Sequence, residues 1–131
     1  MTIELRLLVY SIILGIVHLI AASHFISSQY GYRWTAGNRE EQMPPLTGMA
    51  GRIDRGVMNF LETFPFFAAA VLIAHVVGAH NALTVWGAQL YFWGRVAYAI
   101  IYAIGIPVAR SIAWNIAVLG IFLIVIACLQ T

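Results

Sequence analysis

The chain has no lysine, a single cysteine, Cys128, and charged side chains at only 9% of its 131 positions. A lone cysteine cannot form an intramolecular disulfide, so a disulfide framework is excluded. The seven arginines and five acidic residues leave a net charge of +2 and form no basic run, so nucleic-acid binding is not indicated. The histidines form two pairs whose spacing does not place both rings on one helix face, so no metal site is predicted. These histidines are His18, His24, His75 and His80.

Hydrophobic residues make up 62% of the chain, a composition that indicates an integral-membrane protein. Four apolar segments are each long enough to cross a bilayer. They are Leu7–Ile26, Val57–Val77, Leu83–Ile106 and Ile112–Leu129. Because the connections between the last three are short, we predict a single all-α membrane domain over residues 1–131, an antiparallel four-helix bundle.

The arginines also predict how the bundle is oriented. Arg33, Arg39, Arg52 and Arg110 lie in or beside the first and third connections, whereas the second connection has no basic residue other than histidine. Positive residues favour the cytoplasmic side, so we expect these two connections in the cytoplasm and both termini on the opposite side.

A polar stripe enters the second apolar segment. At about 100° per residue, Arg52, Arg55, Asn59 and Glu62 project from one side of a helix. Charges at membrane depth are costly and usually pair, face the bundle interior or line a ligand site. We favour a ligand role for Arg55, whereas Arg52 is better explained as an anchor whose side chain reaches the headgroups.

A second polar stripe follows the third apolar segment, where Tyr91, Arg95, Tyr98 and Tyr102 share one helical face. Arg95 would pair either with Glu62 or with a ligand carboxylate, and both alternatives stay open. The phenols of Tyr98 and Tyr102 can donate hydrogen bonds to a carboxylate or thiolate, whereas Tyr91 is better explained as an ordinary packing or interfacial aromatic residue.

Together these motifs resemble the MAPEG family, the membrane-associated proteins of eicosanoid and glutathione metabolism. The resemblance covers essentially the whole chain. The family pattern R-x-x-R-x-x-x-N-x-x-E-x-x-P is matched by Arg52, Arg55, Asn59, Glu62 and Pro65. Its arginine with following tyrosines is matched by Arg95, Tyr98 and Tyr102, and its later arginine and serine by Arg110 and Ser111.

The resemblance implies a homotrimer that binds glutathione between neighbouring subunits near the cytoplasmic side. The implied glutathione-binding residues are Arg55, Asn59, Glu62, Arg95, Tyr98 and Tyr102. Glu62 would take the γ-glutamyl amine. Arg110 would activate the thiol and Ser111 would be a weaker candidate for a hydrogen bond to the sulfur. Without the resemblance, Arg110 would be interpreted only as a positive-inside anchor.

Two classes of function follow. The first is a glutathione-dependent transferase or peroxidase that acts on lipophilic electrophiles or lipid hydroperoxides reaching it from the membrane lipids. The second is a non-enzymatic membrane protein, either a small carrier or an assembly subunit whose buried ion pairs fix helix register. A carrier more often has internal repeats, and none is evident in this sequence.

Overall fold

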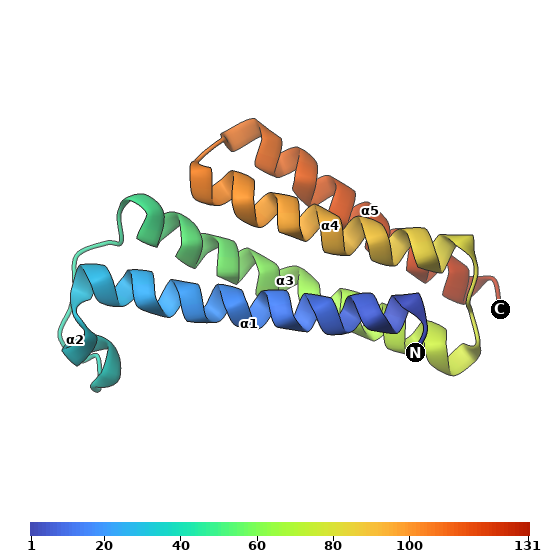
Figure 1. Cartoon of the computed structure of the whole chain (residues 1–131), viewed down its shortest axis with the longest axis horizontal. Coiled ribbons are helices and arrows are strands. Elements are labelled where there is room, and N and C mark those ends of the chain that lie inside the picture. Colours follow the sequence, from blue (N-terminus) through green and yellow to red (C-terminus); the bar gives the residue numbers. More distant parts are fainter.

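The computed structural model describes residues 1–131 and contains five α-helices and no strand. The helices are α1 (Ile3–Tyr30), α2 (Tyr32–Ala36), α3 (Gly48–Val77), α4 (Ala82–Ile104) and α5 (Pro107–Leu129). Figure 1 shows α1 beside α3 and α4 beside α5, with both termini at one end of the bundle. The turn between α4 and α5 lies at the other end, as does α2.

Three helices, α1, α3 and α5, are long and apolar enough to cross a membrane. This agrees with three of the four predicted spans. The fourth, α4, has 23 residues but does not share this apolar character. Its Arg95 and Gln89 lower the hydropathy of the segment, so the crossing of α4 stays a prediction based on its length.

Several helices extend beyond the predicted membrane spans. The second long helix begins at Gly48 rather than near residue 57, and the last begins at Pro107 rather than at residue 112. The first extends beyond the predicted span at both ends, and the short α2 was not predicted. The reason is that an apolar run marks where a helix can enter lipid, whereas the helix itself continues through polar residues. Arg52, Asp54 and Arg55 all lie on the helical turns before the apolar run of α3.

Two glycines allow α4 and α5 to pack very closely. A Cβ atom added to Gly87 would lie 2.5 Å from the carbonyl oxygen of Gly120, so a side chain at this position would force the helices apart. On the inner side of α4, the ring of Tyr91 stacks on Phe67 of α3 with 4.0 Å between centroids. Tyr91 also shares a 3.1 Å hydrogen bond with Thr63. This side chain therefore packs in the core, as predicted.

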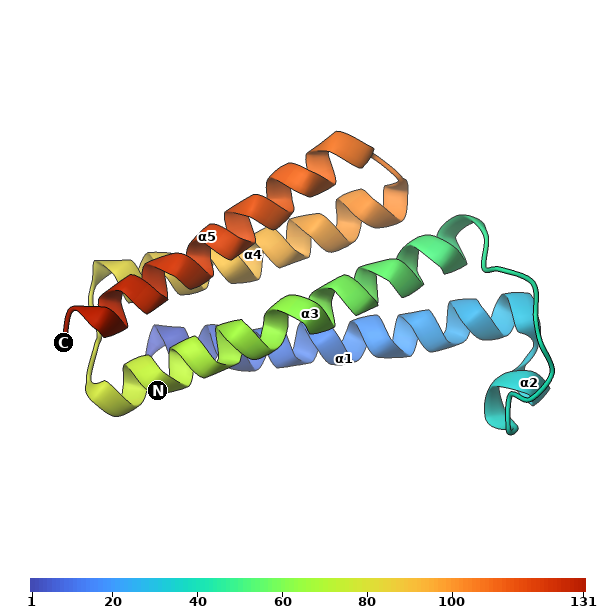
Figure 2. The same cartoon turned by 180° about the vertical axis from the view of Figure 1, so that it is seen from behind.

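At the end that holds the termini, the buried carboxylate of Glu4 links α1 to the start of α4. Thr84 Oγ1 donates to Glu4 Oε1 at 2.6 Å, and His80 Nδ1 lies 3.6 Å from the same oxygen. Asn81 caps the first turn of α4 through the backbone amide of Thr84. These contacts hold the start of α1 against the start of α4. At the other end, the α4/α5 pair rises away from α1 (Figures 1 and 2).

Candidate functional site

Three arginines surround a small recess at the end of the bundle that holds the α4–α5 turn. We call it the arginine recess. It has a volume of about 300 Å³. It is lined by Arg52, Arg55, Tyr102, Gly105, Ile106, Pro107 and Arg110. Residues from α3, α4 and α5 meet here, so the tertiary fold brings the two predicted polar stripes to the same end of the molecule.

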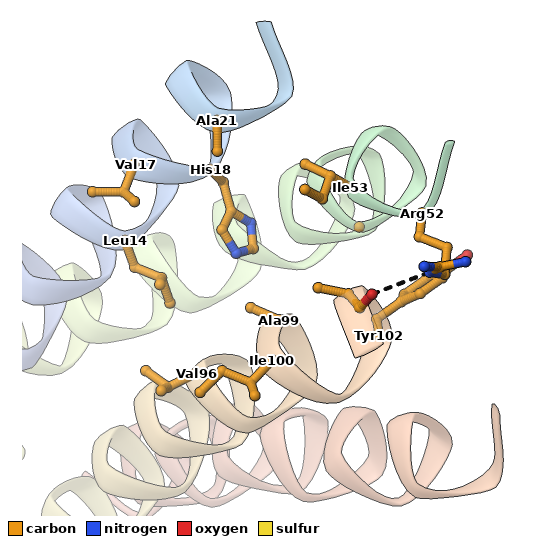
Figure 3. Close-up of a pocket in the computed structure, with 12 residues that line it drawn as sticks. Leu14, Val17, His18, Ala21, Arg52, Ile53, Val96, Ala99, Ile100 and Tyr102 are labelled. Atoms are coloured by element: carbon orange, nitrogen blue, oxygen red, sulfur yellow. Dashed lines mark hydrogen bonds between the residues drawn. The ribbon is translucent and has the colours of Figure 1, made fainter. Parts of the chain in front are cut away.

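Tyr102 is the centre of the contacts in the recess. Arg55 Nε donates to Tyr102 Oη at 2.8 Å, and Arg110 Cζ lies 4.9 Å from the centroid of the Tyr102 ring. Arg52, for which we predict a headgroup anchor, donates from Nε to the carbonyl oxygen of Ala103 at 3.1 Å (Figure 3). That hydrogen bond joins α3 to the last turn of α4, where the helix leaves carbonyl groups without intrahelical partners.

Arg95 lies deeper in the bundle and is fully buried. Its Nη1 donates to Asn59 Oδ1 at 2.7 Å, and its Cζ lies 4.2 Å from the centroid of Tyr98 and 5.5 Å from that of Phe60. Two of its nitrogen atoms, Nε and Nη2, are buried and have no hydrogen-bond partner. Tyr98 in turn packs edge-on against Tyr102, with 5.5 Å between centroids. A continuous chain of contacts therefore runs from Asn59 to the arginine recess.

Within the chain, no carboxylate lies within 4.0 Å of these arginines. The single ion pair closer than 4.0 Å joins His80 to Glu4 at the opposite end of the bundle. The four arginines therefore contact uncharged groups. Arg52 contacts a carbonyl oxygen and Arg55 a phenol. Arg95 contacts an amide and a tyrosine ring, and Arg110 contacts a tyrosine ring. Arginines grouped without close carboxylate partners can attract an anion.

Glu62 does not join this group. The alternative in which Glu62 pairs with Arg95 is wrong for the subunit, because Arg95 bonds to Asn59 and forms no ion pair. Glu62 is exposed and lines a groove of about 460 Å³ between α3 and α5, next to Phe66 and Trp114. The shared helical face was identified from the sequence, but position along and around α3 decides which neighbour each side chain meets.

Ser111 is also apart from the recess. It is exposed on the first turns of α5 and does not line the recess, and its carbonyl oxygen accepts a hydrogen bond from Asn115 Nδ2 at 2.8 Å. Its neighbour Arg110, in contrast, is half-buried against Tyr102. The two predicted thiol-directed residues therefore differ in how directly they face the recess.

Sequence reasoning overlooked His18, which was considered only as a metal ligand. This side chain lies in the middle of α1, beside an apolar cavity, and its buried Nδ1 has no partner. An available signal was that His18 is the one histidine, arginine or acidic residue between Arg6 and His24 in a largely apolar segment. Ionisable residues inside membrane spans usually have a function.

The fold is all-helical, three of its helices are long and apolar enough to cross a membrane, and its arginine cluster includes the fully buried Arg95. These features are typical of an integral-membrane helical protein. The profile of the MAPEG family matches residues 7–130, and the chain belongs to this family. Membership supports, at the level of the family, a role in glutathione or eicosanoid metabolism at the membrane. No curated protein matches the chain significantly.

Proposed function

We propose that the protein is a glutathione-dependent membrane enzyme, a transferase or peroxidase that acts on lipophilic electrophiles or lipid hydroperoxides. The observation that carries the proposal is the set of four arginines without a carboxylate partner in the subunit. Glutathione has two carboxylates, and a ligand with this chemistry would offset the uncompensated positive charge. The family of the chain supports the same ligand.

The residues of the cluster fit a peptide-like anion. Arg55 and Tyr102 present a guanidinium group and a phenol to the recess, and both donate to carboxylates. Asn59 and Tyr98 supply an amide and a second phenol. Arg95 donates a hydrogen bond to Asn59 and packs over the ring of Tyr98. The two unpartnered nitrogens of Arg95 are consistent with a site whose charge balance includes a ligand.

Arg110 is the residue proposed to activate the thiol. A guanidinium group near sulfur stabilises the thiolate over the thiol, and the thiolate is the nucleophile. In the transferase reaction the sulfur forms a bond to an electrophilic carbon while that carbon loses a leaving group with its bonding electrons or the electron pair of a double bond. The thiol proton is released to solvent or taken up by the group that received those electrons. In the peroxidase reaction two thiols and one hydroperoxide yield one disulfide, one alcohol and one water. Ser111 stays a weaker candidate for a hydrogen bond to the sulfur, because it lies outside the recess.

Glu62 fits this proposal only if a second subunit completes the site. Its carboxylate has no partner within the chain and lies in the groove between α3 and α5. A homotrimer would cover this groove with a neighbouring subunit and bring Glu62 beside the amine of glutathione bound there. The recess also lies at the end that the arginine distribution assigns to the cytoplasm.

The test is the thermal stability of the detergent-purified protein in a glutathione titration. A ligand that binds only the folded state raises the melting temperature as its concentration increases. We expect such a rise, together with a predominant trimer by native mass spectrometry. An unchanged melting temperature across the titration would contradict the proposal.

A matched control separates binding from chemistry. The tripeptide in which 2-aminobutyrate replaces cysteine keeps both carboxylates and the amine but has no thiol. We expect it to raise the melting temperature as glutathione does, and to inhibit turnover by competition. Binding of both tripeptides without turnover of any electrophile or hydroperoxide would favour the non-enzymatic assembly subunit.

A further inference from the structure

A second polar recess lies in the connection between α1 and α3, and we call it the α2 recess. It has a volume of about 390 Å³ and shares no wall residue with the arginine recess. In both views of the fold, α2 lies on the side of α1 opposite the α4/α5 pair (Figures 1 and 2). The wall includes two aromatic rings and four charged side chains, Tyr30, Trp34, Arg33, Arg39, Glu40 and Glu41.

The four charged side chains of the α2 recess carry both signs, yet they do not pair with one another. Neither Arg33 nor Arg39 has a nitrogen within 4.0 Å of a carboxylate oxygen, since the one ion pair of the chain lies at the other end of the bundle. Arg39 instead donates from Nε to the carbonyl oxygen of Thr35 at 3.0 Å, and its Cζ lies 5.4 Å from the centroid of the Trp34 ring. Two cations and two anions in one recess are complementary to a zwitterion rather than to a simple anion.

The connection around the recess is held by side-chain hydrogen bonds. Trp34 Nε1 donates to the carbonyl oxygen of Glu41 at 2.9 Å, and Gln29 Nε2 donates to that of Pro45 at 3.0 Å. Arg39 has a φ of 58°, a left-handed conformation that is uncommon for residues other than glycine. A ligand that binds charged groups on an ordered connection loses less free energy to ordering the protein.

The position of α2 along α1 indicates which ligand is available to the recess. His24 Nδ1 shares a 3.1 Å hydrogen bond with Tyr32 Oη, and Ser27 Oγ donates to Thr35 Oγ1 at 2.9 Å. These contacts hold α2 beside the end of the predicted span Leu7–Ile26. That level is the border between hydrocarbon and headgroups, where tyrosine and tryptophan are enriched in membrane proteins. The zwitterionic molecules that every bilayer provides at this depth are phospholipid headgroups.

We infer that the α2 recess binds the headgroup of phosphatidylethanolamine from the adjoining leaflet. The guanidinium groups of Arg33 and Arg39 donate to the phosphate oxygens, and the carboxylates of Glu40 and Glu41 accept from the ammonium group. The acyl chains stay in the bilayer beside α1. This inference does not depend on the proposed function, because no residue of the arginine recess takes part in it.

The aromatic rings favour ethanolamine over choline. Proteins recognise the quaternary ammonium of choline with the faces of several aromatic rings, because choline has no N–H group to donate. In the α2 recess the Trp34 ring is covered by Arg39, and Tyr30 packs edge-on against it with 4.9 Å between centroids. The two carboxylates remain for a cation, and they accept hydrogen bonds only from an ammonium that carries N–H groups.

The test compares phosphatidylethanolamine with phosphatidylcholine of identical acyl chains. The two lipids share the phosphate and differ only in the methyl groups on nitrogen, so general attraction to the protein surface cancels in the ratio of their affinities. Native mass spectrometry of the detergent-purified protein with each lipid measures both dissociation constants. We expect phosphatidylethanolamine to bind about fivefold more tightly, the size expected for solvent-exposed charge pairs. Equal affinities overturn the inference.

Two double variants locate the two halves of the headgroup. Glu40→Gln with Glu41→Gln should lower the affinity for phosphatidylethanolamine to that for phosphatidylcholine and leave the latter unchanged. Arg33→Gln with Arg39→Gln should weaken both lipids by a similar factor and preserve their ratio. These four side chains are exposed, so the melting temperature without lipid should stay that of the wild type. A wild-type preference in the glutamine-for-glutamate variant overturns the site.

Asp54→Asn is the matched control for charge. It removes a carboxylate near the same end of the bundle, on the first turns of α3, and Asp54 does not line the α2 recess. We expect it to keep the full preference for phosphatidylethanolamine. Loss of the preference in this variant would mean that overall charge, rather than the recess, sets the lipid selectivity, and it would overturn the inference.

Soluble phosphoethanolamine separates a lipid site from a metabolite site. The free compound has the same charges but no acyl chains, so at equal concentration it should not displace the bound lipid. Displacement at equal concentration would assign the recess to a soluble ligand and overturn the lipid assignment. Glutathione binding is measured on the same preparation, so that a failure of the proposed function and a failure of this inference are seen separately.

Discussion

The two ends of the bundle differ in whether their charged side chains have partners within the chain. At the end with the termini, the carboxylate of Glu4 is 4% exposed and has Thr84 and His80 as partners within the chain. At the other end, four arginines have no carboxylate partner, and Arg95 is fully buried with two unpartnered nitrogens. A charge whose partners are all internal can contribute to the fold, whereas an uncompensated buried charge is suited to a partner from outside the chain.

The sharpest test of this contrast is Arg95→Met, for which we expect the largest effect. Removing a buried guanidinium group that lacks two partners should leave the melting temperature unchanged or raise it. Glutathione affinity should fall about 100-fold, because the site loses positive charge and the support of Asn59. Calorimetry and thermal unfolding of the same preparation measure both quantities. A large loss of stability would mean that Arg95 acts mainly in the fold.

At the opposite end, Thr84→Val should lower stability and leave glutathione affinity unchanged, the reverse of what we expect for Arg95→Met. The substitution removes the donor to the buried carboxylate of Glu4 and one partner in the cap of α4. We expect a loss of about 2–3 kcal/mol of stability, the cost of removing a hydrogen bond to a charged group together with part of a cap. Thr84→Ser keeps the hydroxyl and should remain close to wild type. Glutathione affinity should not change in either variant.

Glu62 lies outside both groups. Substituting it tests whether its carboxylate contacts a neighbouring subunit or a ligand. Glu62→Gln should weaken glutathione binding by about 1.5–3 kcal/mol if the carboxylate meets the ligand amine. The trimer should stay intact by native mass spectrometry. If the oligomer dissociates instead, the carboxylate holds subunits together, and unchanged affinity in an intact trimer would remove Glu62 from the ligand site.

The smallest expected effect concerns chemistry rather than binding. Arg110→Ala should lower turnover at pH 7 about tenfold while glutathione affinity changes little, because an unassisted thiol is only a few per cent thiolate at that pH. The deficit should shrink as the pH is raised toward the ordinary thiol pKa, where the wild type and the variant both form thiolate. Ultraviolet absorbance of the thiolate in the bound complex measures the titration directly. Identical titrations in both proteins would leave Arg110 as an anchor.

Much of the site was predictable because helical periodicity fixes which side chains share a face. The stripe containing Arg55 and Asn59 and the stripe containing Arg95, Tyr98 and Tyr102 do meet, through the bonds from Arg55 to Tyr102 and from Arg95 to Asn59. Periodicity within one helix does not specify how helices cross, however. For that reason the separation of Glu62 from Arg95 was not predictable.

The sequence by itself determined that there are four long helical segments, that they are largely apolar, that two of them carry polar stripes, and that the chain belongs to the MAPEG family. These properties depend on local composition and on spacing along one helix. Only the tertiary structure decided that Arg95 meets Asn59, that Arg52 meets Ala103, and that His18 faces a cavity beside Tyr102. Those contacts join residues 36 or more positions apart, and they depend on how the packed helices are placed against one another.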